Sequence, residues 1–106
     1  MSSTEVTNNT ESSRFEITVD GAMAGYAQYR QAPKQQRAFL HTEVDPAYRG
    51  QGLGGTLIRS ALDSTREAGF GVLPYCPAFQ GVIAKSPEYL ELVPAQRRAE
   101  FNLETD

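Results

Sequence analysis

The chain is poor in reactive and metal-binding side chains: its 106 residues include one cysteine, one histidine and no tryptophan. A single cysteine cannot close a disulfide within the chain, and one cysteine with one histidine is too few ligands for an ordinary zinc site. Every apolar run is far shorter than the roughly 20 residues that a helix needs to cross a bilayer, and the first residues lack the basic and apolar regions of a secretory signal. We therefore expect a cytoplasmic protein that needs neither a metal nor a membrane.

Basic residues are also few, with 10 Lys and Arg against 13 Asp and Glu, for a formal net charge of −3. From Arg14 to Val93 the two signs balance, with eight side chains of each, so the net charge arises at the two ends. Nucleic-acid binding depends on clustered Lys and Arg. The sequence therefore argues against RNA or DNA as a direct ligand.

A chain of this length fits one domain with a modest core. Residues 1–13 are rich in Ser, Thr, Asn and Glu, which predicts a disordered N-terminal tail. Residues 14–93 form the predicted domain. Residues 94–106 carry only Phe101 and Leu103 as large apolar side chains, and we expect a C-terminal tail that is either helical or disordered.

The first half of the domain reads as antiparallel strands. Residues 14–19 alternate apolar and polar side chains, Asp20-Gly21 is a hairpin turn signal, and residues 22–29 form a second predicted strand. Residues 37–44 form a third.

A helix and a strand follow. Apolar residues recur at helical spacing from Leu53, and Gly69 ends the predicted helix. Residues 70–75 then form a short strand, and a helix between two strands implies a parallel pairing. Because Pro74 cannot donate a hydrogen bond, this strand is expected to part from its neighbour near its end. The predicted fold class is mixed α/β (α+β), with a mostly antiparallel sheet and a central βαβ unit. Two short helices, at residues 79–85 and from Pro87, are expected to complete it.

The most informative motif is the glycine-rich stretch from Arg49 to Gly55, which joins the third strand to the long helix. Glycines let the backbone approach a ligand closely, and the following helix directs free amides and the positive end of its dipole at the same point. The stretch lacks the Lys of a P-loop, and its third glycine comes too early for a dinucleotide fingerprint. It therefore predicts a phosphate-binding loop of another kind.

The order of motifs resembles the Gcn5-related N-acetyltransferase (GNAT) superfamily, and within it the compact YjdJ-like subgroup. The resemblance rests on His41 to Val44, on Arg49 to Leu53, on Pro74 with Cys76, and on Ser86 to Leu90. It covers roughly Arg14 to Val93. It implies a GNAT-like sheet whose βαβ unit binds acetyl-CoA as cosubstrate, and an amine acceptor on a metabolite or a protein. The residues expected to contact acetyl-CoA are Val44, Arg49, Gly50, Gln51, Gly52, Leu53, Gly54 and Gly55, with Arg49 either binding phosphate or bracing the loop.

Acetyl transfer to an amine requires a group that accepts the amine proton. His41 and Glu43 are two apart on a strand and therefore share a face beside the loop. Glu43 is a candidate base, directly or through water, or a residue that pins the loop. For His41 the structural role is favoured.

Cys76 is the third candidate catalytic residue. Most lone cysteines are small buried hydrophobes, but the resemblance implies a cysteine at this place that lines the site or accepts the acetyl group. Direct transfer from CoA to the amine is favoured over that covalent route. The subgroup commonly has a Tyr where this chain has Ala78 and an aromatic hydroxyl where it has Val82. Tyr75, Cys76, Tyr89 or water then remain to protonate the leaving thiolate.

A module that binds or senses acyl-CoA without catalysis is the alternative, because it would use the same loop and differ only at Glu43 and Cys76. A domain without any ligand is a third possibility. Binding of CoA, and release of its thiol in the presence of amines, separate the three.

Overall fold

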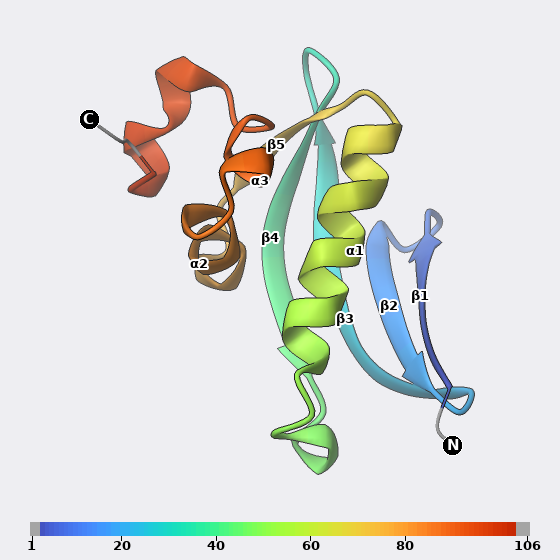
Figure 1. Ribbon diagram of the computed structural model, residues 1–106. Coiled ribbons are helices and arrows are strands. Elements are labelled where there is room, and N and C mark those ends of the chain that lie inside the picture. Colours follow the sequence, from blue (N-terminus) through green and yellow to red (C-terminus); the bar gives the residue numbers. More distant parts are fainter. Residues whose placement is uncertain (1–2, 104–106) are drawn as a thin grey trace.

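A computed structural model, which describes residues 3–103, contains one five-stranded sheet with the strand order β1-β2-β3-β4-β5 (Figure 1). The first four strands form an antiparallel meander, and β5 pairs with β4 in parallel. The strands are β1 (Thr4–Asn9), β2 (Arg14–Val19), β3 (Ala22–Ala32), β4 (Gln36–Val44) and β5 (Gly71–Pro74). The predicted mixed fold is confirmed, and β1 adds a fourth antiparallel strand to the three that were predicted before the parallel one.

Three helices accompany the sheet: α1 (Leu53–Glu67), α2 (Pro77–Ala84) and α3 (Pro87–Leu90). α1 lies across one face of the sheet and contacts β2, β3 and β4, and α2 packs against α1 and β5 (Figure 1). Three short 3-10 turns also occur, η1 (Pro46–Tyr48), η2 (Ala95–Arg97) and η3 (Ala99–Phe101). Within residues 3–103 no helix is both long and apolar enough to span a bilayer.

Phe39 on β4 is the centre of the core and is fully buried. Its ring stacks on that of Phe79 from α2 at a centroid distance of 4.3 Å and approaches those of Phe15 and Tyr29 at 6.2 and 6.0 Å. α1 contributes to this core the buried side chains that its periodicity predicts, Leu53, Leu57, Ile58, Ala61 and Leu62. This packing holds α1 and α2 against each other and against the sheet.

A bulge in β4 decides which side chains face the core. Tyr29 pairs with Phe39 but Gln28 pairs with His41, so Leu40 is an extra residue without a partner on β3. Paired residues share a face of a sheet. His41 therefore lies with the exposed Gln28 rather than with the core residue Phe39. We call the face that carries Tyr26, Gln28, His41 and Glu43, away from α1, the outer face.

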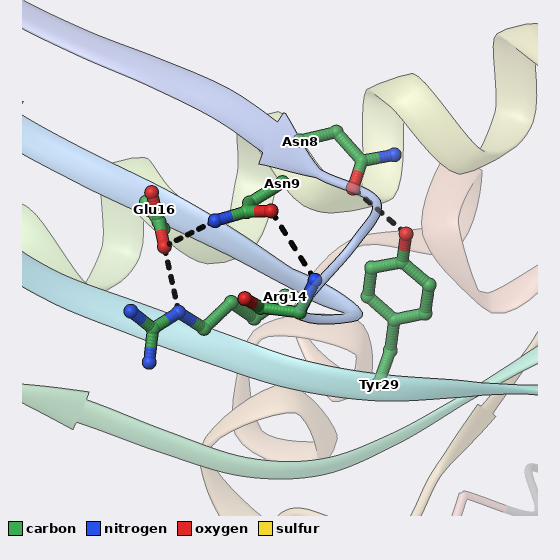
Figure 2. Close-up of polar contacts among 6 residues, drawn as sticks. Asn8, Asn9, Arg14, Glu16 and Tyr29 are labelled. Carbon is green, nitrogen blue, oxygen red and sulfur yellow. Dashed lines mark hydrogen bonds and ion pairs between the residues drawn. The ribbon is translucent and has the colours of Figure 1, made fainter.

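The prediction of a disordered tail over residues 1–13 is wrong for residues 4–9, which form β1. β1 is an edge strand paired along its whole length with β2. Figure 2 shows its end, where Asn9 Nδ2 and Arg14 Nε donate to Glu16 Oε2 at 3.0 and 2.6 Å, and the Tyr29 hydroxyl donates to Asn8 Oδ1 at 2.7 Å. These contacts join a polar segment to the sheet, and composition alone does not reveal them.

The last part of the chain is also more ordered than a tail. Phe101, the last residue of η3, and Leu103 are buried, at 2% and 3% exposure. The Phe101 ring meets that of Tyr75 edge-on at 5.1 Å, and Arg98 Nε donates to the carbonyl of Val93 at 3.0 Å. Residues 104–106 of the predicted tail lie outside the described residues.

The Glu16 contacts make a prediction about pH. The hydrogen bond from Arg14, with that from Asn9, lowers the pKa of Glu16 below its ordinary value. A lowered pKa stabilises the fold above the pKa of the unfolded chain, and this stabilisation is lost as the pH falls through the folded-state pKa. Acidification from pH 6 to pH 3 should therefore lower the unfolding free energy of wild type by about 0.5–1 kcal/mol more than it lowers that of Glu16→Gln. Urea denaturation at the two pH values measures this. Glu67→Gln, at an exposed position on α1, is the control and should behave like wild type. Equal acid sensitivity of wild type and Glu16→Gln would contradict the account.

Candidate functional site

The two central parallel strands separate after a short pairing. β4 and β5 pair from Gln36 with Gly71 to Phe39 with Pro74, and the amide of Cys76 donates to the carbonyl of Phe39 at 3.0 Å. β4 then runs on to Val44, and among residues 3–103 no β5 residue pairs with it beyond Phe39. The expected parting is confirmed, but the missing Pro74 amide is not its cause. The amide of Val72 donates to Leu92, away from β4, and an amide two residues later on the strand would point the same way. The parting leaves one backbone edge of β4 open between the ends of the two strands.

The chain turns from β4 into the glycine loop through η1. Asp45 caps this turn, because its Oδ1 accepts from the amide of Ala47 at 2.9 Å. The amide of Arg49 donates to Pro46 and that of Gln51 to Tyr48. Between and after them, Gly50 and Gly52 have φ values of +84° and +72°. Most other residues rarely adopt this left-handed region, so the loop favours glycine at both positions.

The amides that follow are free. The first bond into α1 runs from Thr56 to the carbonyl of Gly52 at 3.2 Å. Within the described part of the chain, the amides of Gly50 and of Gly52 to Gly55 have no hydrogen-bond partner. Free amides at a helix start, with the positive end of the helix dipole, form an anion site. The loop has the features expected of a phosphate cradle.

The predicted loop side chains have different roles in this geometry. Leu53 is buried, at 7% exposure, so that only its amide is available to a ligand. Val44 is half-buried, and its Cγ2 lies 3.8 Å from where a Cβ on Gly54 would be, so it supports the loop from the end of β4. Arg49 and Gln51 are exposed.

Arg59, on α1, lies beside the loop and is a residue that the sequence did not single out. Its guanidinium Nη2 lies 3.2 Å from the position that a Cβ on Gly55 would occupy. Residues four apart on a helix share a face, so the spacing of Gly55 and Arg59 is the signal that was missed. Arg59 adds a positive charge beside the free amides.

His41 and Glu43 meet on the outer face of β4. His41 Nε2 lies 3.7 Å from Glu43 Oε1, and both side chains are more than half exposed. Tyr26, opposite Glu43 on β3, donates its hydroxyl proton to Glu43 Oε2 at 3.0 Å. This hydrogen bond raises the pKa of Tyr26 above its ordinary value. Tyr26 was not predicted, because only the β3 and β4 register brings it to Glu43.

Cys76 is separated from this pair. It is the N-cap residue of α2, is 5% exposed, and its Sγ lies 3.4 Å from Thr42 Oγ1. Thr42 pairs with the buried Ala27 and so faces the opposite side of β4 from His41 and Glu43. The structure therefore groups the predicted catalytic residues as His41 with Glu43 on one face, and Cys76 with Thr42 on the other.

The two tyrosines considered as proton donors are both in hydrogen bonds. Tyr89 donates to Asp63 Oδ1 at 2.9 Å, and burial together with Asp63 raises its pKa. The Tyr75 hydroxyl accepts from Arg97 Nη2 at 2.9 Å and is exposed. Residues 3–103 also hold no cluster of three His, Cys, Asp or Glu side chains that could bind a metal.

Two cavities are lined by outer-face residues of β3 and β4. One of about 440 Å³ is lined by eight residues that include Met23, Tyr26, Glu43 and Asp45. The other, of about 560 Å³, is lined by twelve that include Leu40 and Tyr75, next to the point where β4 and β5 part. The outer face of β4 therefore lies between these two cavities.

The sequence is similar to those of known proteins. The family described as GCN5-related N-acetyl-transferase matches residues 14–92. Streptothricin acetyltransferase of Streptomyces lavendulae is 40% identical over 58 residues, which are 54% of this chain and 31% of that protein. The chain thus matches about a third of the length of this curated relative.

Solved structures agree on the fold. A GCN5-like protein of Staphylococcus aureus, solved in solution, superposes with a TM-score of 0.65 at 21% identity, over 85% of this chain and 87% of that one. The ribosomal-protein-S18-alanine N-acetyltransferase of Escherichia coli superposes with a TM-score of 0.54 at 20% identity, over 68% and 64%. The match over residues 14–92, together with the parted strands and the glycine loop, shows that the chain belongs to the GCN5-related N-acetyltransferase family.

Proposed function

We propose that the chain transfers the acetyl group of acetyl-CoA to a primary amine, in the cytoplasm. The observation that carries this proposal is the row of free amides at Gly50 and from Gly52 to Gly55, next to the open edge of β4. Family membership supports the reaction class. Acetyl-CoA supplies an acetyl group activated as a thioester, and the chain supplies its binding and the removal of a proton.

The glycine loop is the proposed site for the diphosphate of CoA. The free amides donate to phosphate oxygens, and Arg49 and Arg59 add positive charge at the mouth of the loop. Space supports this, because a Cβ on Gly50 or Gly52 would meet no atom within 4 Å. The glycines therefore serve the backbone conformation and leave room beside it.

A matched pair of substitutions at Gly52 tests the loop. Asn and Asp both tolerate a left-handed φ and have nearly the same shape, but Asp places a negative charge beside the proposed phosphates. Two like charges about 4 Å apart repel by about 1–4 kcal/mol, so Gly52→Asp should bind CoA at least about fivefold more weakly than Gly52→Asn. Calorimetric titration with CoA measures this, and thermal unfolding confirms that both variants fold. Equal affinities for the two variants would contradict a phosphate at this loop.

Glu43 is the proposed base. An amine attacks only after it has lost a proton, and Glu43 presents an exposed carboxylate on the outer face, next to the open part of β4. Tyr26 and His41 hold its two oxygens, at 3.0 and 3.7 Å. We assign Tyr26 and His41 to the positioning of Glu43, which leaves the carboxylate to accept the proton directly or through a water molecule.

Glu43→Gln should therefore lower kcat by about 10²–10⁴-fold and leave the affinity for CoA within about twofold of wild type. Tyr26→Phe keeps the carboxylate but frees one oxygen, and its kcat should fall much less. Release of the CoA thiol in the presence of a panel of amines measures both. An unchanged kcat in Glu43→Gln would remove Glu43 as the base. CoA binding without thiol release from wild type, for any amine, would favour the acyl-CoA-sensing alternative.

Cys76 is assigned to the wall of the site, and the acetyl group passes directly to the amine. Its Sγ is buried and shares a contact with Thr42 on the face away from Glu43. A covalent acetyl-cysteine would need an accessible thiolate, and these contacts do not favour one.

Cys76→Ala should accordingly keep kcat within about threefold of wild type, since it removes only packing. Mass spectrometry of the wild-type chain incubated with acetyl-CoA should show no acetyl group on Cys76. Loss of turnover in Cys76→Ala, together with an acetylated Cys76 in the wild type, would establish the covalent route instead.

A further inference from the structure

The two cavities on the outer face carry opposite charge. Among residues 3–103, the larger, of about 560 Å³, is lined by the basic residues Arg30, Lys34 and Arg97 and by no Asp or Glu. In the same part of the chain, the smaller is lined by Glu43 and Asp45 and by no Lys or Arg. Basic and acidic side chains thus lie at separate cavities, and the proposed base Glu43 lies at the acidic one.

Two of the three basic groups have no counter-charge. Arg97 pairs with Glu100 at 2.9 Å, and its Nη2 also donates to the Tyr75 hydroxyl at 2.9 Å. Arg30 and Lys34 form no ion pair with any residue between 3 and 103. The larger cavity therefore presents net positive charge, beside the apolar surfaces of Leu40 and Tyr75.

Lys34 occupies a position where lysine is costly. Pro33, Lys34 and Gln35 form the three-residue turn between β3 and β4, at the tip of that hairpin in Figure 1, and Lys34 and Gln35 have φ values of +66° and +55°. Residues other than Gly, Asn and Asp are strained at such φ values. The amide of Gly71 donates to the carbonyl of Gln35 at 2.9 Å, which ties the turn to the start of β5. Strained backbone is often found at functional sites, and here the strained turn places Lys34 at the larger cavity.

Resting on the function proposed above, we propose that the acceptor carries an anionic group, a carboxylate or a phosphate, in addition to its amine. Arg30 and Lys34 bind the anion in the larger cavity, and the amine lies at Glu43. Ala38, which pairs with Arg30, and Glu43 are five residues apart on β4, or roughly 15 Å along a strand. Because the basic side chains are long, the amine and the anion of the acceptor are separated by on the order of 10 Å.

Three acceptors of equal length test the proposal: 6-aminohexanoate, 4-aminobutyl phosphate and the neutral 6-aminohexanamide. Wild type should have a kcat/KM at least about tenfold higher for one or both anionic amines than for the amide, since hydrogen bonds to charged groups are worth about that much each. The ratio of the carboxylate to the phosphate identifies the preferred anion. In the double variant Arg30→Gln, Lys34→Gln this preference should disappear through a higher KM, with kcat for the amide unchanged. The matched control is Lys85→Gln, an exposed lysine outside both cavities, which should keep the wild-type preference.

Binding measured without turnover keeps this inference separate from the proposed reaction. Wild type should bind the preferred anionic amine more tightly than the amide in calorimetric titration, and the double variant should not. If this difference is seen while no thiol is released, the anion site stands and the proposed acetyl transfer fails. Equal binding of all three amines by wild type, or an undiminished preference in the double variant, would overturn the anion site whether or not acetyl transfer is observed.

Discussion

The site depends on the early end of the pairing between β4 and β5. The two strands are joined only from Gln36 to Phe39 on β4, because the amide of Tyr75 turns back to the carbonyl of Leu73 and the amide of Cys76 takes the carbonyl of Phe39. Behind this short pairing, the stacked rings of Phe39 and Phe79 hold β4 and α2 together. This contact fixes the position on β4 at which the two strands separate. The open edge of β4, the glycine loop that follows it and the burial of Cys76 beside Thr42 all follow from this one junction.

β4 separates two tasks by its faces. The residues that turn toward α1, such as Phe39 and Thr42, belong to the core or touch Cys76. The bulge at Leu40 turns His41 and Glu43 to the outer face, where the oppositely charged cavities lie. In a strand without a bulge, Phe39, His41 and Glu43 would share one face. The extra residue therefore lets one short strand supply a buried anchor and an exposed carboxylate, which suits a chain too small for additional elements.

Local patterns predicted most of the fold. The alternation of residues 14–19 and the helical spacing from Leu53 each act within a few residues, so the sequence displays them. β1 escaped prediction because its stability comes from pairing with β2 and from contacts such as Asn9 with Glu16, not from apolar composition. The meeting of Tyr26 with Glu43 depends on strand register. The placement of Arg30 and Lys34 in one cavity and of Glu43 and Asp45 in the other depends on the folded surface. The sequence shows only that positive and negative side chains are equal in number from Arg14 to Val93.

The central claim is that the free amides of the glycine loop bind the diphosphate of CoA. The most direct test follows the backbone amide signals of the wild-type chain by NMR during titration with CoA. The account predicts that the largest shifts, saturating with the binding curve, occur at Gly50 and from Gly52 to Gly55, where the amides have no partner among residues 3–103. Saturation of the protein with CoA while these five signals stay in place, or the absence of any binding, would contradict it.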